Sequence, residues 1–413
     1  MSPRNIALAG CATLAVAMGI GRFAFTPIMP MMLHDGVVDL QRASWLASTN
    51  YVGYLLGAVL CTLDPWLRRR LGIHHAADPT MLVRLGLAAT ALLTLAMALP
   101  WPAAWPALRF AVGMVSAYVL LQSSGWCLAQ LAARGAPALG GVMFTGPGAG
   151  IVASGLLGSA MVSWQWPASA AWVVFGLLAA LLSAAAWRVF RPENEVSNAD
   201  SAGLLAAAPT TTGGPLAPHH RHGRVEVAML AIAYGMSGFG YIVTATYLPV
   251  IAREAVAGSP LIDLFWPIFG AGVVCGALLS SRVSAAIDRR WLLAGAYVLQ
   301  AAGIGLGVAS PTEIGFALGS LLLGFPFTTL TLFALQEARR IRPQAAVSTM
   351  GLITTVWAIG QALGPPMVAA LLQRSPGNAH VAFQRSLIVA AAALLLGAAI
   401  FTASTQAWPA KRP

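Results

Sequence analysis

Arg22 stands inside an otherwise apolar run near the start of the chain, where residues 19–30 read Gly-Ile-Gly-Arg-Phe-Ala-Phe-Thr-Pro-Ile-Met-Pro. A charged side chain in the middle of a lipid-spanning helix costs about 2.5–3.5 kcal/mol even on the most lenient insertion scale. It persists where it faces a cavity or a partner. Because a guanidinium binds carboxylate or phosphate through paired hydrogen bonds, Arg22 is a candidate anchor for an anionic ligand.

The sequence offers Arg22 no obvious counter-charge at the same depth. The acidic residues nearest to apolar segments fall at or near segment ends: Asp64, Glu226, Asp263, Glu313 and Glu337. Two interpretations therefore stay open. Arg22 binds a carboxylate-bearing ligand, or it donates to backbone carbonyls that Pro27 and Pro30 free in a broken helix.

Other polar and aromatic side chains lie toward the middle of apolar segments. Tyr241 and Thr244 are one helical turn apart, and three further pairs are spaced by four residues, so each pair shares a helix face. Such groups either line a cavity or pack between helices. The candidate ligand-binding residues are Arg22, Tyr241, Thr244, Gln122, Trp126, Asn50, Tyr54, Trp357 and Gln361.

Proline and glycine inside apolar segments mark candidate helix breaks, which could act as gating hinges. The candidates are Pro27, Pro30, Pro249, Pro326, Gly146, Pro147 and Gly150. For the glycines, including Gly19 and Gly21, close packing of helices is the favoured interpretation.

The composition indicates a membrane protein. Of 413 residues, 58% are hydrophobic and only 9% are charged, whereas soluble domains carry about 25% charged residues. The formal charge of +11 comes from Lys and Arg in short gaps between apolar runs, which argues against a nucleic-acid-binding surface. The four cysteines have no paired spacing, so we expect neither a disulfide nor a metal site, and no cofactor. The scarcity of His, Asp and Glu within the segments argues against an enzyme.

Twelve segments are apolar and long enough to span a bilayer. They are 6–32, 43–64, 80–100, 106–131, 138–163, 168–190, 226–251, 261–282, 290–309, 313–337, 346–372 and 382–404. The predicted fold is an all-α membrane protein with 12 transmembrane helices in two six-helix bundles, residues 1–190 and 225–413. Residues 191–224 form the predicted cytoplasmic linker.

Counting basic residues predicts the orientation. Eighteen of the 24 Lys and Arg residues lie in loops on the side of the termini, five lie on the other side, Arg109 among them, and Arg22 is inside a span. Both termini are therefore predicted to be cytoplasmic.

The two halves also repeat. Gly-Ile-Gly-Arg at 19–22 aligns with Gly-Phe-Gly-Tyr at 238–241, and the same alignment places Pro30 opposite Pro249. Tyr241 thus occupies the position of Arg22 in the second half. Because both halves start on the same side, they are parallel repeats related by a pseudo-twofold axis along the membrane normal.

The six-plus-six arrangement, the linker and this repeat resemble the major facilitator superfamily. Residues 19–30, the stretch Ser-Trp-Leu-Ala-Ser-Thr-Asn-Tyr-Val-Gly-Tyr-Leu-Leu-Gly at 44–57, and Gly-Phe-Gly-Tyr-Ile-Val-Thr-Ala-Thr-Tyr-Leu-Pro at 238–249 resemble its YbfB/YjiJ-like group. Arg109, with Gly113 and Ala117, resembles an Arg-plus-small-residue pattern of the superfamily. The resemblance implies a multi-pass transporter of the bacterial inner membrane. Cys61 departs from the family pattern, which has Asp at this step.

We therefore expect alternating-access transport of a small solute, a carboxylate-bearing organic anion anchored by Arg22. Efflux of hydrophobic or drug-like compounds, with Arg22 structural, is the alternative, and a non-transporting membrane sensor is the second. The expected partners are the solute, the lipid bilayer and protons as a candidate coupling ion, with no nucleic acid, in a monomer. Glu226 and Asp263 are the nearest candidates for proton coupling.

Overall fold

The computed structural model describes residues 1–72, 78–190, 222–256, 258–259, 262–280, 282–283, 287–342 and 346–409. Within these ranges, twelve helices are long and apolar enough to cross a membrane, and each overlaps one of the predicted spans. The predicted linker lies outside the described residues up to 221, and α10 begins at His222.

The first six spans are built from nine helical segments. They are α1 (Pro3–Leu14), a π-helical segment (Ala15–Ile20), α2 (Phe25–His34), α3 (Leu40–Arg70), α4 (Pro79–Ala96), α5 (Trp105–Ala133), α6 (Gly140–Met143) with α7 (Gly146–Ser163), and α8 (Ala168–Trp187). The second six are α10 (His222–Ala255), α11 (Phe265–Ser280), α12 (Arg289–Ala309), α13 (Glu313–Gly324) with α14 (Phe327–Ile341), α15 (Ala346–Gln373) and α16 (Ala379–Ala407).

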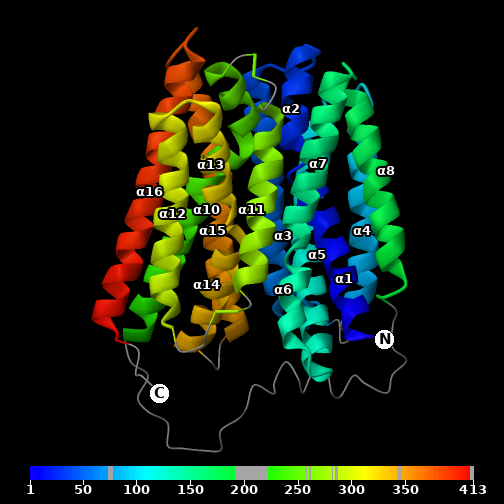
Figure 1. The fold of residues 1–413 in the computed structure, drawn as a ribbon. Coiled ribbons are helices and arrows are strands. Elements are labelled where there is room, and N and C mark those ends of the chain that lie inside the picture. The colour runs from blue at the N-terminus through cyan, green and yellow to red at the C-terminus, as the bar shows by residue number, and fades with distance from the viewer. Residues whose placement is uncertain are drawn as a thin grey trace, which may run out of the picture.

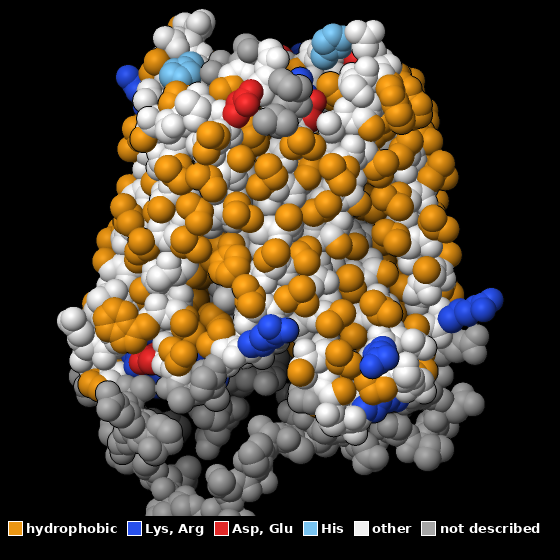
Figure 2. Space-filling model, in the orientation of Figure 1, with side chains coloured by type: hydrophobic (Ala, Val, Ile, Leu, Met, Phe, Trp, Pro, Cys, Tyr) orange, Lys and Arg blue, Asp and Glu red, His pale blue; other side chains and the backbone are white. Residues whose placement is uncertain are grey.

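The two bundles stand side by side with their helices upright (Figure 1). Helices α1 and α10 begin, and α16 ends, at the same end of the molecule, which we call the termini end. Apolar side chains cover the middle of the surface, as contact with lipid requires (Figure 2). Lys and Arg side chains gather toward the termini end, the end predicted to face the cytoplasm.

Close packing at glycines joins the helices around the centre. A Cβ atom on Gly19 would lie 2.5 Å from the Cα of Gly150, so the first and fifth spans touch backbone to backbone. Across the two halves, a Cβ on Gly148 would lie 2.8 Å from the carbonyl oxygen of Gly270. The glycines of the fifth span therefore serve close helix packing, the interpretation favoured from the sequence.

The first span is interrupted one turn before its prolines. The π-helical segment ends at Ile20, and α2 begins at Phe25 and continues through Pro30. The prediction that Pro27 and Pro30 themselves break the helix is thus wrong in position. The N–H of Thr26 turns to the carbonyl of Phe23 (3.1 Å), three residues back, which leaves the carbonyl of Arg22 without its helical partner.

The repeat-related α10 contains no break at Pro249, contrary to the prediction. Proline carries no N–H, so the carbonyl four residues earlier, that of Ala245, loses its helical donor. The hydroxyl of Thr26 donates to that carbonyl at 2.9 Å. The two residues are equivalents in the repeat, because Thr26 aligns with Ala245. Their contact joins the two bundles about one turn after Arg22 along the first span.

The fifth and tenth spans are interrupted as well. The fifth span divides between α6 and α7, with Gly146 and Pro147 opening α7. The tenth divides between α13 and α14, where Pro326 is the residue before the first helical residue of α14. Whether these interruptions act as hinges stays a prediction.

Candidate functional site

Arg22 lies at the junction of the two bundles, and its side chain is 1% exposed. Its Nη2 donates to Oε1 of Gln361 on α15 at 2.5 Å. The amide nitrogen of Gln361 in turn donates to the hydroxyl of Tyr241 on α10. A hydrogen-bonded chain therefore links Arg22 to Tyr241, the residue that replaces it in the second repeat.

Aromatic rings surround the Arg22 guanidinium. Its Cζ lies 4.0 Å from the ring centroid of Tyr54 on α3 and 5.2 Å from that of Phe23. Trp357 lies 5.9 Å away and stacks on Tyr241, with the two rings 13° from parallel. These ring faces carry partial negative charge, so they stabilise the cation without forming an ion pair. We call Arg22, Gln361, Tyr241, Tyr54 and Trp357 the Arg22 site.

The Arg22 guanidinium keeps unused donors. Its Nε and Nη1 atoms are buried and have no hydrogen-bond partner. Among the described residues no Asp or Glu forms an ion pair with Arg22. Because a buried charge without a counter-charge is costly, the site is electrostatically incomplete as it stands.

Arg109 on α5 donates to the freed backbone carbonyls of the first span, a role that the sequence analysis had considered for Arg22. It is 1% exposed, and its Nη1 and Nη2 donate to the carbonyls of Gly21 and Arg22, both at 3.3 Å. These are carbonyls at the interruption of the first span. Asn50 donates to the carbonyl of Arg109 at 2.9 Å, which ties α3 to this arrangement.

The basic-residue count placed Arg109 on the outer side, although its number falls inside the predicted span 106–131, and the structure places its side chain inside the bundle. Its spacing of four residues from Gly113, noted above as an Arg-plus-small-residue pattern, was the signal, because a Cβ on Gly113 would lie 2.0 Å from the carbonyl oxygen of Asn50. Such close approach of two helices leaves the arginine no route to water. Two buried guanidiniums therefore flank the interruption of the first span, and the described residues provide neither with an acidic partner.

Three further predicted residues, Thr244, Gln122 and Trp126, lie in two different places. Thr244 is buried on α10, and its hydroxyl has no partner. Gln122 and Trp126 lie away from Arg22: the Gln122 amide points to the sulfur of Cys61 (3.6 Å), and Trp126 packs on Phe190 near the termini end (5.2 Å between centroids). Helical spacing put these two on one face of α5, but that face turns toward the first bundle's own helices.

Three aromatic residues near Arg22 were missed. Tyr51 lies 5.4 Å from the guanidinium, and its hydroxyl is 2.9 Å from that of Thr246 on α10. Phe23 and Phe327 meet edge to face with centroids 5.9 Å apart. A Phe in an apolar segment gives no signal in sequence. Tyr51 could have been noticed, because it lies three residues before Tyr54 on α3 and so at a similar depth.

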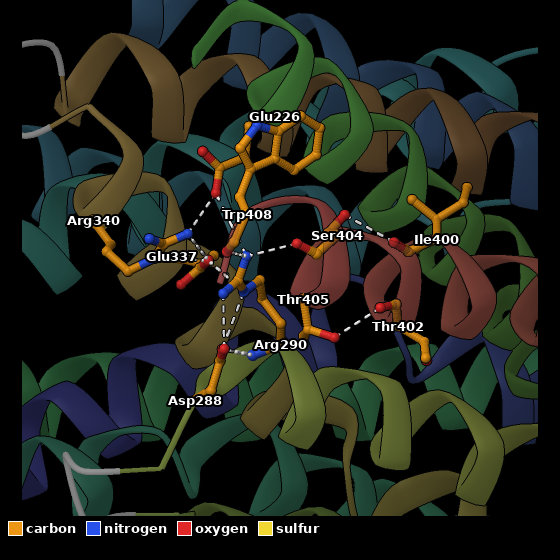
Figure 3. A network of polar contacts seen from close by, with 10 residues as sticks. All are labelled: Glu226, Asp288, Arg290, Glu337, Arg340, Ile400, Thr402, Ser404, Thr405 and Trp408. Carbon is orange, nitrogen blue, oxygen red and sulfur yellow. Dashed lines mark hydrogen bonds and ion pairs between the residues drawn. The ribbon is translucent and has the colours of Figure 1, made fainter. Parts of the chain in front are cut away.

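A separate charged cluster closes the termini end of the second bundle (Figure 3). Arg290 is 2% exposed at the side chain and pairs with Asp288 at 2.8 Å, Glu337 at 3.5 Å and Glu226 at 3.7 Å. Arg340 pairs with Glu226 and Glu337 at 2.5 and 2.7 Å. Three carboxylates thus share two guanidiniums, and the cluster joins the ends of α10, α12 and α14.

Arg290 also holds the end of α16. Its Nη1 donates to the carbonyls of Ser404 (2.9 Å) and Trp408 (2.8 Å), where helix C-terminal carbonyls lack helical donors. Burial acts to raise the pKa of Asp288, but hydrogen bonds and charge from Arg290 outweigh it, so its pKa lies below the usual 3.8. Since the folded-state pKa is lowered, this carboxylate stabilises the fold above pH 3.8, and the contribution is lost as the pH falls through the folded value.

We expect Arg290→Met to destabilise the second bundle strongly. The substitution leaves three carboxylates with only Arg340 and frees two carbonyls, and removing one partner of a buried ion pair costs about 3–5 kcal/mol. Thermal unfolding of the purified protein measures the effect. The neighbouring Arg289→Met is the control, because Arg289 donates only to Gln336 among the described residues. Equal melting temperatures for the two variants would contradict this role of Arg290.

Neither acidic candidate for coupling is free. Glu226 belongs to the cluster described above, and Asp263 pairs with Arg253. Both lie near helix ends, which agrees with the simpler interpretation that they are helix-end charges. The residues that the structure describes contain no group of His, Cys, Asp or Glu arranged to hold a metal ion.

Comparison with known proteins identifies the architecture. A family described as "Uncharacterised MFS-type transporter YbfB" matches residues 14–402. The crystal structure of a mutant of the nucleoside transporter NupG superposes with a TM-score of 0.67 at 14% sequence identity, covering 97% of this chain and 99% of that one. At that identity the likeness establishes a shared fold. No curated protein sequence matches the chain.

Proposed function

Because the chain belongs to the YbfB family of MFS-type transporters, we propose that it moves a small carboxylate-bearing organic anion across the bacterial inner membrane by alternating access. One observation carries the proposal: the buried Arg22 guanidinium has two unused donor nitrogens and no acidic partner among the described residues. A carboxylate bound there would supply both the missing acceptors and the missing charge.

The site also offers neutral groups for the rest of the ligand. Gln361 and Tyr241 come from the second bundle, whereas Arg22 and Tyr54 come from the first. A ligand held by both bundles can couple its binding to their relative movement, as alternating access requires. We propose that residues 1–190 and 225–413 move as two bodies joined by residues 191–224, with both termini in the cytoplasm.

The ligand class can be tested by thermal shift. Purified protein is screened against small carboxylates, inorganic phosphate and lipophilic cations. We expect one class of carboxylate to raise the melting temperature, because a ligand at 100 times its Kd adds about 2.7 kcal/mol to stability. The same carboxylates should give no shift with Arg22→Ala.

The aromatic rings around Arg22 favour one competing function, efflux of hydrophobic compounds. In that case lipophilic cations would stabilise the protein, and they would do so equally in Arg22→Ala. That result would refute the anion proposal and make Arg22 a structural residue.

A further inference from the structure

A cavity of about 330 Å³ opens between the two bundles toward the termini end. Figure 2 shows this face of the molecule, hollowed between its two halves near that end. Its lining comes from α5, α6, α11, α12 and α14, and most of it is apolar, with Leu128, Phe144, Leu332 and Phe333 among the lining residues.

The polar side chains that line this cavity come from α11 (Ser280), α12 (Arg289) and α14 (Thr328 and Gln336). Gln336, near the end of α14, accepts a hydrogen bond from Nε of Arg289, and both residues line the cavity. Thr328, in the first turn of α14, lines it as well; this side chain is 8% exposed, and its hydroxyl has no partner. The cavity therefore extends along α14 from the termini end to the interruption of the tenth span.

Its charge is of one sign. Arg289 is the only charged residue among the described lining, which contains no Asp or Glu. The nearby carboxylates, Glu226, Asp288 and Glu337, are taken up in ion pairs with Arg290 and Arg340. A concave site whose described lining carries one guanidinium and no carboxylate attracts anions.

Two aromatic rings in contact connect the inner end of this cavity, at Thr328, with the Arg22 site. Phe327 precedes Thr328 and touches both Phe23 (5.9 Å) and Tyr241 (4.8 Å) through its ring. Phe23 lies directly under the Arg22 guanidinium and is 1% exposed. Each ring sits beside an interruption of its span, where the backbone is not held by a continuous helical hydrogen-bond ladder.

We propose that the cavity is a second ligand site on the transport path. It takes an organic anion with an apolar body, attracted by Arg289 and received by Thr328, and the Phe23 and Phe327 rings form a gate that closes it from the Arg22 site. The inference rests on the proposed anion transport. Its test uses no transported substrate. The cavity proposal can therefore fail while Arg22 still binds a carboxylate, and the Arg22 proposal can fail while the cavity proposal stands.

The experiment measures how fast charged thiol reagents modify single introduced cysteines. Thr328→Cys reports on the cavity, and Thr244→Cys reports on α10 one turn beyond Tyr241, counted from the termini end. Each purified variant reacts with a methanethiosulfonate bearing either a sulfonate or a trimethylammonium group, and mass spectrometry locates the modification. Rates are divided by those of each reagent with free cysteine, and the native buried Cys127 reports on unfolding.

We expect the cysteine at position 328 to react about 10-fold faster with the sulfonate than with the ammonium reagent, and Arg289→Gln to remove that preference. The cysteine at position 244 should react slowly until Phe327→Ala is added, which should speed it at least about 10-fold. Phe316→Ala is the matched control, because Phe316 is also buried in the same bundle (3% exposed, against 7% for Phe327) but packs on Phe265.

Three results would overturn the proposal. The cysteine at 328 reacts as slowly as Cys127, or it prefers the cationic reagent, or the cysteine at 244 reacts at one rate with and without Phe327→Ala. Acceleration by Phe316→Ala equal to that by Phe327→Ala would also count against the gate. If Phe327→Ala unfolds, Phe327→Leu removes the ring while keeping an apolar side chain and answers the same question.

Discussion

Gln361→Glu is expected to weaken anion binding and to raise the melting temperature of the protein. In the structure the Gln361 carbonyl oxygen lies 2.5 Å from Nη2 of Arg22. A carboxylate in the same place gives the guanidinium a permanent partner and competes with the ligand for it. Hydrogen bonds to charged groups are worth about 1.5–3 kcal/mol, so the affinity for the carboxylate ligand should fall about 10- to 150-fold. Titration calorimetry and thermal unfolding measure the two effects.

The rise in stability distinguishes this prediction from simple damage to the site. An unpaired buried charge destabilises the fold, and the new carboxylate removes that penalty. Gln300→Glu is the matched control, because Gln300 is fully buried on α12 and donates to the carbonyl of Leu323 (3.1 Å), with no ion pair or cation–π contact recorded at that position. The control should lower the melting temperature. If Gln361→Glu lowered it as much, Arg22 would already be neutralised in some other way.

The apolar periodicity of the sequence was sufficient to predict the spans, because lipid requires each one to be long, apolar and internally hydrogen-bonded. All twelve predicted spans correspond to helices among the described residues. The repeat was equally accessible, since it needed only the match between residues 19–30 and 238–249. What it implied for Arg22 and Tyr241 is now specific: Gln361 bridges the two side chains.

The neighbours of Arg22 could be predicted only in part. Tyr54, Trp357, Gln361 and Tyr241 were identified by depth and helical face, and they do meet. Depth does not reveal how a helix is rotated within its bundle, however, and so Gln122 and Trp126 were grouped with them although α5 turns both elsewhere.

The helix interruptions show the same limit. A proline predicts that a carbonyl loses its donor, but the sequence does not say what replaces it. At Ala245 the replacement is the hydroxyl of Thr26 from the other bundle, and the helix stays straight enough to continue. At Arg22 no proline is involved: the N–H of Thr26 turns to the carbonyl of Phe23, a guanidinium from α5 donates to the Arg22 carbonyl instead, and the span is interrupted. The difference depends on long-range contacts that no local pattern contains.

Arg109→Met is expected to weaken ligand binding while changing the melting temperature of the ligand-free protein little. Removing the guanidinium leaves the carbonyls of Gly21 and Arg22 unsatisfied, at about 1–3 kcal/mol each. It also relieves the burial of an unpaired charge, which costs about 2.5–3.5 kcal/mol in the membrane. These two effects are of similar size and opposite sign, so stability should change little.

Binding should nevertheless weaken, because Arg109 fixes the backbone from which Arg22 projects. Freed carbonyls will find other donors, and the interruption of the first span will move with them. We expect the affinity for the stabilising carboxylate to fall at least about 10-fold, or 1.4 kcal/mol, although Arg22 is still present in this variant. Arg109→Lys can reach only one of the two carbonyls at a time, so its affinity for the carboxylate should lie between those of the unmodified protein and Arg109→Met.

Arg84→Met separates this positioning role from the mere loss of an arginine. Arg84 also donates to a backbone carbonyl, that of Trp187 at 3.0 Å, but at the exposed end of its span. Its removal should alter neither binding nor melting temperature beyond about 0.5 kcal/mol. Unchanged carboxylate binding in Arg109→Met would show that the interruption holds its shape without Arg109. Arg22 would then be positioned by Gln361 and the Tyr54 ring alone.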